Sequence, residues 1–315
     1  MDYNAPILIA GHTGLIGSAF TRLLKARGYD NLLLPGHAEL ELADAPAVDA
    51  YFARHRPAYV VLAAGQSGGI MHNQRFPADL MRANLAIQSS VLEAAHKHQA
   101  RRLIFFASSC MYPRECPQPM AEESLLRGHP EPTSIAYATA KLAGLQLCLA
   151  YNRQYGETRF IPVIPNSVYG PGDNFDSTSG HVLSALLCRF HEASQAGQPE
   201  IVLWGSGTPR REFLHSDDLA EACLRLLQHE GEELPLPINV GPGQDVSIRD
   251  LAKAIANATD YRGHIAWDTE KPDGAPRKLL DSSRIRALGW EPRVSLVQGI
   301  EQLYAWYRSQ VVTPS

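Results

Sequence analysis

The chain has 315 residues, 45% of them hydrophobic, and a formal net charge of −4 at neutral pH. This length suffices for one large or two modest domains with a buried core. The balance of charge, without a basic block, argues against a general nucleic-acid binder. No apolar run approaches the length of a membrane span. Five scattered cysteines and the lack of signal-peptide features predict free thiols in the cytoplasm, and no Cys/His spacing is typical of a metal site.

Apolar runs alternate with helical stretches through the first half of the chain. The expected strands span 7–10, 31–34, 59–64, 103–107 and 160–164, and the expected helices span 18–27, 45–55, 78–98 and 135–155. Continuous apolar strands predict a parallel sheet that is covered on both faces. The alternation therefore predicts an α/β fold with a Rossmann-type doubly wound sheet. Pro162 leaves the limits of the fifth strand open, because proline cannot donate to the strand ladder.

Three glycines follow the first apolar run and precede the first helical stretch. A strand, a glycine turn and a helix N-terminus in this order form a site for a dinucleotide pyrophosphate. The glycines permit a tight turn and a close approach, and the free N–H groups at the helix start face the anion. The predicted cofactor-binding residues of this turn are Gly11, Thr13, Gly14, Leu15, Ile16 and Gly17.

The pattern changes after about residue 170. A polar loop spans 170–180, a helix is expected over 181–196, and a strand is expected over 201–204. We predict a dinucleotide-binding Rossmann domain over 1–170 and a smaller, partly interleaved substrate-binding region over 171–315. Segments near 212–230 are expected to return to the first domain.

Tyr137 and Lys141 share one face of the predicted helix 135–155, because they are four residues apart. A lysine ammonium beside a phenol is expected to lower the pKa of Tyr137. Such a tyrosine can exchange a proton with a carbonyl oxygen near neutral pH. Ser108 follows a predicted strand, at the edge where open α/β sheets bind ligands, and can hydrogen-bond the same oxygen. A Tyr/Lys pair alone is common on ordinary helices, so the prediction of catalysis depends on all three residues and the glycine turn.

The glycine turn, Ser108 and the Tyr137/Lys141 pair resemble the extended short-chain dehydrogenase/reductase family. Longer strings resemble one branch of it, the GDP-L-fucose synthases. These strings are SSCMYP at 108–113, PMAE at 119–122, YGPGDNF at 169–175, WGSGTP at 204–209, REFLH at 211–215 and KPDGAPRK at 271–278. The similarity runs over nearly the whole chain.

The resemblance implies a two-step conversion of GDP-4-keto-6-deoxy-D-mannose to GDP-L-fucose: epimerisation at C3 and C5, then reduction of the C4 ketone. A ketone acidifies both neighbouring carbons, and Ser108 and Tyr137 would hold the developing oxyanion. The resemblance assigns Cys110 as the base and His181 as the acid on the opposite face. Taken alone, Cys110 is more typical of a small buried hydrophobe and His181 of a surface or capping residue. Lys141 would also hold the nicotinamide ribose.

The resemblance also implies a substrate site. Arg189 lies about two helical turns after His181 and is expected on the same side of its helix. Guanidinium forks suit a diphosphate, although a single arginine is more often a solvated surface charge. The predicted substrate-binding residues are Ser109, Asn166, Ser167, His181, Arg189, Trp204, Arg211 and Lys278. The expected partners are a GDP-sugar and a second copy of the chain. The apolar face of helix 78–98 is explained equally well by covering the sheet.

The chain departs from the family pattern at a few positions. The family implies NADP(H), but Thr13 and His37 replace arginines that would contact its 2′-phosphate, which leaves NAD(H) open. No acidic residue ends the second strand, as an NAD site often has. Ser167 replaces an asparagine, and Gly65-Gln66 replaces Ala-Lys. These changes leave open a colitose- or heptose-type GDP-4-keto sugar, or an epimerase or dehydratase that retains NAD. A non-enzymatic cofactor-binding protein is disfavoured by the full set of acid and base groups.

Overall fold

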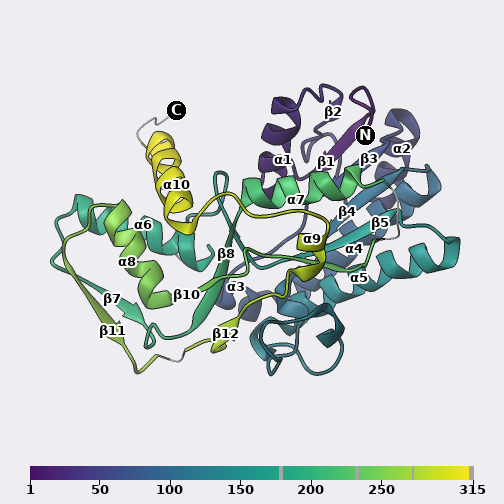
Figure 1. Cartoon of the computed structure of the whole chain (residues 1–315). Helices are drawn as coiled ribbons and strands as arrows, with labels where there is room; N and C mark the ends of the chain where they lie inside the picture. Colours follow the sequence, from purple (N-terminus) through teal and green to yellow (C-terminus); the bar gives the residue numbers. More distant parts are fainter. Residues whose placement is uncertain (177–179, 231–233, 272, 312–315) are drawn as a thin grey trace.

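The computed structural model describes residues 1–176, 180–230, 234–271 and 273–311. Pro272 in the last family-like string and residues 177–179 of the polar loop lie outside them. A larger part surrounds the long parallel sheet, and a smaller part carries α6, α8 and α10 (Figure 1). Strands β8, β10 and β12 lie between the two parts in this view.

The central sheet has six parallel strands. Their order is β2 (Leu32–Leu33), β1 (Ile7–Ala10), β3 (Tyr59–Leu62), β4 (Arg102–Phe106), β5 (Phe160–Pro165) and β9 (Ile238–Val240). The strand order reverses between β1 and β3, which is the switch point where such sheets bind ligands. The predicted doubly wound fold is therefore confirmed. The first five strands match the expected runs within two residues at each end, whereas β9 was not expected.

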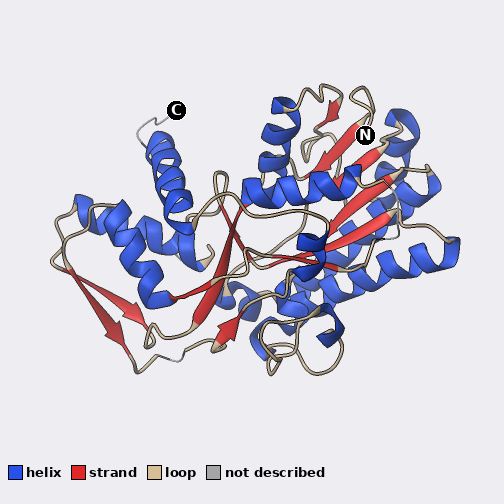
Figure 2. Ribbon diagram, viewed as in Figure 1, coloured by secondary structure: helices blue, strands red, loops and turns tan. Residues whose placement is uncertain are grey.

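Alternate residues of each strand enter two separate cores, because successive side chains point to opposite faces. Ile7 and Ile9 pack with α1 (Leu15–Ala26) and α7 (Ser216–Gln228). Leu8 and Ala10 belong to the other core. Its helices are α2 (Ala45–His55), α4 (Pro77–Lys97) and α5 (Ile135–Tyr155), and Figure 2 shows helices around the sheet. Helix α1 begins three residues earlier than expected, because Gly14 is its N-cap residue.

Pro162 lies inside β5 without breaking the sheet. The carbonyls of Arg159 and Val163 accept bonds from Leu103 of β4 and from Ala107 directly after it, with N–O distances of 2.9 and 2.8 Å. Pro162 is out of phase with these two residues, so its backbone nitrogen faces the other neighbour, β9. Pairing with β9 begins only at Val163, so no ladder bond is lost at the proline.

The smaller part has its own core. It joins α6 (Val182–Gln195), β7 (Glu200–Trp204), α8 (Ile248–Ala258), β11 (His264–Asp268) and α10 (Leu296–Val311). The expected helix and strand at 181–204 are present. Strand β8 (Arg210–His215) pairs with β6 (Ser167–Tyr169), β10 (Asp245–Ser247) and β12 (Arg277–Lys278). The shorter helices are α3 (Ile70–Arg75), α9 (Ser283–Ala287), η1 (Ser109–Met111), η2 (Glu122–Ser124) and η3 (Pro132–Ser134).

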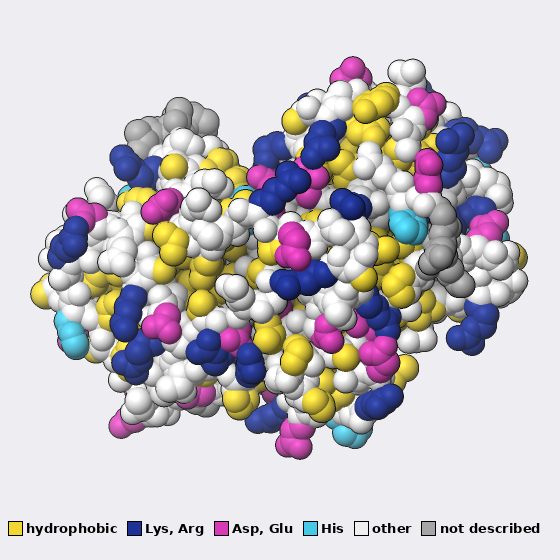
Figure 3. All heavy atoms as spheres, viewed as in Figure 1, with side chains coloured by type: hydrophobic (Ala, Val, Ile, Leu, Met, Phe, Trp, Pro, Cys, Tyr) yellow, Lys and Arg dark blue, Asp and Glu magenta, His cyan; other side chains and the backbone are white. Residues whose placement is uncertain are grey.

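Segments that follow the polar loop complete the larger part: α7 covers one face of the central sheet and β9 forms its edge. The exact domain limits stay a prediction. Over the described residues, no helix combines the length and apolarity that crossing a bilayer requires. On the face drawn in Figure 3, basic and acidic side chains are interspersed.

Candidate active site

The glycine turn forms a cradle at the start of α1. Gly11 has φ +87°, and a Cβ there would lie 2.7 Å from the Ala64 nitrogen. A Cβ at Gly17 would lie 2.1 Å from the Gly11 oxygen. At Gly14 the nearest atom is 3.6 Å away, so backbone is open to a ligand there. The first turn of α1 has no acidic residue. The cradle therefore fits a dinucleotide pyrophosphate.

Neither of the two departures near this cradle supplies a permanent positive charge. Thr13 is exposed. The His37 side chain is 94% exposed, and its Nδ1 lies 3.8 Å from the Glu41 carboxylate. A 2′-phosphate would therefore meet no guanidinium from either position.

Lys141 is buried on α5 and turns toward the end of β4. Its Nζ donates to the Phe106 carbonyl at 3.0 Å and lies 5.3 Å from the centre of the Phe105 ring. A Cβ at Gly65 would lie 3.3 Å from this Nζ, so the glycine leaves room beside the ammonium. Burial lowers the pKa of Lys141 to about 8.

A group of three side chains lies near Lys141 of α5: Ser108, Cys110 and Tyr137. The Tyr137 hydroxyl lies close enough to the Ser108 side chain for Ser108 to lower its pKa, and the Ser108 Oγ accepts from the Cys110 nitrogen at 3.2 Å. Burial raises the pKa of Tyr137, Cys110 raises it further, and Ser108 opposes both. The expected lowering of the pKa of Tyr137 by Lys141 is therefore wrong for this structure. The physical reason is that desolvation dominates, while the ammonium is directed to a backbone carbonyl.

A buried hydrogen-bond network adjoins these groups. The Ser109 hydroxyl donates to Asn166 Oδ1 at 3.1 Å. The Asn166 Nδ2 donates to Glu212 Oε2 at 2.9 Å and to the Lys278 carbonyl at 3.1 Å. Both amide hydrogens of Asn166 are thus engaged within the protein. Glu212 was not predicted, although a carboxylate beside the apolar Phe213 in a short strand was a usable signal.

Arg211 extends this group from β8. Its Nη1 donates to the Ala275 carbonyl at 2.7 Å, and the thiol of Cys110 is close enough to act on its charge. Burial lowers the pKa of Arg211. Lys278 of β12 pairs in register with Arg211. Ser167 begins β6, directly after Asn166. The structure therefore brings Arg211 near Cys110, with Lys278 beside Arg211 on the neighbouring strand.

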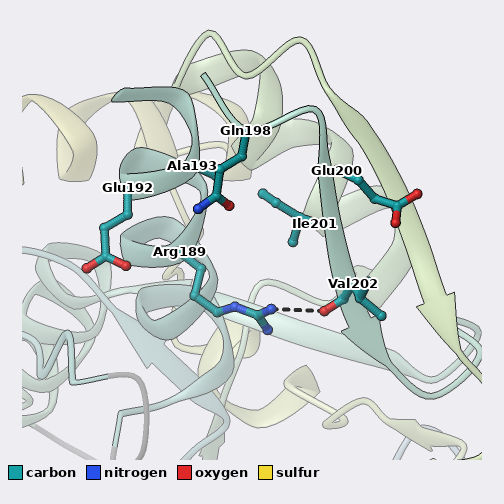
Figure 4. Close-up of a pocket in the computed structure, with 7 residues that line it drawn as sticks. All are labelled: Arg189, Glu192, Ala193, Gln198, Glu200, Ile201 and Val202. Carbon is teal, nitrogen blue, oxygen red and sulfur yellow. Dashed lines mark hydrogen bonds between the residues drawn. The ribbon is translucent and has the colours of Figure 1, made fainter. Parts of the chain in front are cut away.

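Arg189 lies on α6, and Trp204 is the last residue of β7. Arg189 lines a hollow between α6 and β7, and its Nη2 donates to the Val202 carbonyl at 2.9 Å (Figure 4). Trp204 is 67% exposed, and the Lys271 ammonium lies 5.7 Å from the centre of its ring. The other lining residues are Glu192, Ala193, Gln198, Glu200 and Ile201.

His181 is exposed at the start of α6. Its charge lowers the pKa of Asp173, although burial raises that pKa by more. The role of His181 as the opposing acid stays a prediction.

Asn84 is a further residue that the sequence reasoning missed. Its Nδ2 donates to the Gln66 and Leu80 carbonyls at 2.8 and 2.7 Å, and its Oδ1 accepts from the Gln66 nitrogen at 3.3 Å. It thereby holds the segment after β3 that passes Lys141. The signal was a pair of amides, Asn84 and Gln88, among the buried residues of α4.

The chain was compared with known proteins. The model of the NAD dependent epimerase/dehydratase family matches residues 7–241. The chain belongs to this family.

Full-length relatives narrow the assignment to the GDP-L-fucose synthases. GDP-L-fucose synthase 1 of Arabidopsis thaliana is 47% identical over 98% of this chain and 95% of its own length. The Escherichia coli enzyme is 46% identical over 96% of each chain. A GDP-L-colitose synthase of Yersinia pseudotuberculosis is 33% identical over 96% of this chain and 98% of its own. A solved GDP-D-glycero-L-gluco-heptose synthase of Campylobacter jejuni, crystallised with NADPH, has a TM-score of 0.92 and 33% identity, covering 98% and 99% of the two chains.

Proposed function

We propose that this family member converts GDP-4-keto-6-deoxy-D-mannose to GDP-L-fucose by epimerisation at C3 and C5 and reduction at C4. The observation that carries the proposal is the grouping of Ser108, Cys110 and Tyr137 around one point, with Lys141 close behind on the same helix. The full-length similarity to GDP-L-fucose synthases supports the choice of sugar.

Epimerisation needs a base, an acid and an oxyanion site. The Cys110 thiolate takes a proton from C3 or C5, and the electron pair moves onto the ketone oxygen. Ser108 and Tyr137 donate hydrogen bonds to that oxygen, where the negative charge develops. His181 returns a proton to the carbon from the opposite face. The closeness of the Ser108 and Tyr137 side chains supports this assignment, because two neighbouring hydroxyls can donate to one oxygen.

Reduction uses the same oxygen site. Bound NADPH would supply a hydride to C4. Tyr137 gives its hydroxyl proton to the new alkoxide, and Lys141 holds the ribose and favours that transfer. The raised pKa of Tyr137 suits a group that carries its proton until the alkoxide forms.

The nucleotide end of the substrate is assigned to the arginines. Arg211 lies near Cys110, and Lys278 pairs with Arg211 in register on the neighbouring strand. Arg189 lines the hollow between α6 and β7, and Trp204 is exposed at the end of β7. The diphosphate would bind the guanidinium forks, and the exposed Trp204 offers a ring face.

The cofactor preference is proposed to be relaxed, so that NADH is accepted as well as NADPH. The exposed Thr13 and His37 support this, because neither offers a guanidinium to a 2′-phosphate. Measurement of kcat/KM with both reductants tests it. A preference for NADPH above roughly a hundredfold, about 2.7 kcal/mol, would refute the relaxed preference.

A related GDP-4-keto sugar is the second candidate substrate. Ser167 supports it, because a hydroxyl shorter than the family's asparagine changes hydrogen bonding and space near the sugar. A homodimer is also proposed. The cytoplasm is proposed as its compartment, because all five cysteines are free. Leu80, Val91 and Leu92 of α4 are buried in the core beneath the helix, so they are not the dimer surface.

The deciding experiment offers GDP-4-keto-6-deoxy-D-mannose with NADPH or NADH and identifies the product by NMR. GDP-L-fucose with one equivalent of reductant consumed supports the proposal. Turnover without consumption of added reductant would instead indicate an epimerase or dehydratase that retains NAD.

A further inference from the structure

Glu212 is a carboxylate with no exposed surface, in the middle of the network described above. In the described part of the chain it makes no ion pair. Its Oε2 accepts from Asn166 Nδ2 at 2.9 Å and from the Leu280 nitrogen at 3.0 Å, and its Oε1 accepts from the Gly243 nitrogen at 2.7 Å. The bonds reach segments after β5, β9 and β12.

The chemistry of these partners fixes the direction of every bond. Backbone N–H groups only donate, and a carboxylate and a backbone carbonyl only accept. Asn166 faces both the Glu212 carboxylate and the Lys278 carbonyl, so it must present its NH₂ group to them. Its oxygen then faces Ser109, whose hydroxyl must donate. A flipped Asn166 would place its oxygen against two acceptors.

These hydrogen bonds form a relay from Glu212 through Asn166 to Ser109, and the relay ends on the turn that carries Cys110. Ser109 opens η1, and Cys110 is the next residue. Burial raises the pKa of Glu212, so the fold holds this group against a desolvation penalty that an apolar side chain would not incur. The penalty points to a role for Glu212 in orienting its neighbours.

We propose that Glu212 is a positioning residue: its carboxylate orients the Asn166 amide and, through the Ser109 hydroxyl, holds Cys110 in place for proton abstraction. This inference rests on the proposed function, since it assigns the position of the base in that reaction.

The test replaces Glu212 with glutamine, which has the same size. Both Glu212 oxygens accept from N–H groups, so the glutamine NH₂ group would face a donor at either position. We expect deuterium exchange at C3 and C5 to slow by about tenfold or more, with KM for NADPH unchanged. The matched control is Glu122→Gln. Glu122 is also a buried carboxylate that accepts a backbone N–H, from Asn239 at 2.9 Å, but it has no bond to Asn166 or Ser109. The control should exchange at the normal rate.

A polarity swap separates orientation from mere packing. In Asn166→Asp the new carboxylate at position 166 faces the Glu212 carboxylate, and neither can donate. Adding Glu212→Gln supplies an NH₂ group that can donate to the carboxylate at 166. The double variant should therefore exchange faster than Asn166→Asp alone, by several-fold. A double variant no faster than Asn166→Asp, or an unslowed Glu212→Gln, would overturn the proposal.

One readout does not depend on the substrate. Iodoacetamide labelling, resolved by peptide mass spectrometry, should modify Cys110 several-fold faster in Glu212→Gln and also in Ser109→Ala. Cys116 and Cys188 serve as internal references, because both are partly exposed and lie outside the relay. Unchanged labelling of Cys110 in both variants would reject the positioning role even where the wild type makes GDP-L-fucose. A wild type that leaves the sugar unchanged, with Cys110 labelling altered as expected, would reject only the function.

Discussion

Replacing Lys141 with methionine should stabilise the dinucleotide-free protein at neutral pH and abolish ketone reduction. The Lys141 ammonium is buried, and the Phe106 carbonyl accepts its hydrogen bond at 3.0 Å. Methionine fills a similar volume with an unbranched, uncharged chain, so it should fit this space. The variant removes the cost of burying the charge together with the group that would hold the ribose.

The size of the effect follows from the pKa of Lys141, which burial lowers from 10.5 to about 8. That difference corresponds to about 3 kcal/mol of penalty on the charged form. Leaving the Phe106 carbonyl without its donor costs about 1–2 kcal/mol. The variant should therefore be about 1–2 kcal/mol more stable than the wild type near pH 7.

The difference should change with pH in a defined direction. Below about pH 8, Lys141 is protonated in both the folded and the unfolded chain, so the penalty is complete. Between about 8 and 10.5 the unfolded chain keeps a proton that the folded chain has lost, so wild-type stability rises with pH relative to the variant. Above 10.5 only the lost hydrogen bond remains, and the variant should be the less stable protein.

Urea unfolding of both proteins across this pH range measures the difference, and other titrating groups cancel in it. Lys25→Met is the control, because Lys25 is exposed on α1. A Lys141→Met variant that is less stable near pH 7, or a difference that does not depend on pH, would refute the reasoning.

Gly17→Ala should lower stability by about 1–3 kcal/mol and weaken NADPH binding, because its Cβ would lie 2.1 Å from the Gly11 oxygen; Gly36→Ala, with nothing within 4 Å, should unfold as the wild type does in thermal melts. Tyr137→Phe should abolish reduction while deuterium exchange at C3 and C5 persists, as followed by NMR, and retained reduction would assign the proton donor elsewhere. Cys110→Ser should lose exchange first, and a normal exchange rate would mean that another group is the base.

Local patterns carried much of the fold prediction. The buried runs of β1, β3 and β4 are continuous apolar stretches, which only a sheet covered on both faces accommodates. The spacing of Gly11, Gly14 and Gly17 predicted the cradle, because Gly11 and Gly17 leave no room for a Cβ and Gly14 leaves the backbone open to a ligand. These signals lie within a few residues of the atoms that they position.

Other features depend on residues far apart in the sequence. Strand β9 has only three residues, too few to signal a strand, and it exists because β5 offers it an edge. The link from Ser109 to Glu212 joins β4, β5 and β8 through Asn166, and no local pattern predicts it.

The sequence by itself determined the strand and helix pattern, the glycine cradle and the side chains available for acid–base chemistry, because these follow from local periodicity and residue type. Only the tertiary structure decided how those side chains are tuned. Tyr137 and Lys141 share a helix face as expected, yet burial, rather than their mutual charge, sets the direction of both pKa changes. Desolvation depends on everything that packs around a group, and the packing is known only when the whole chain has folded.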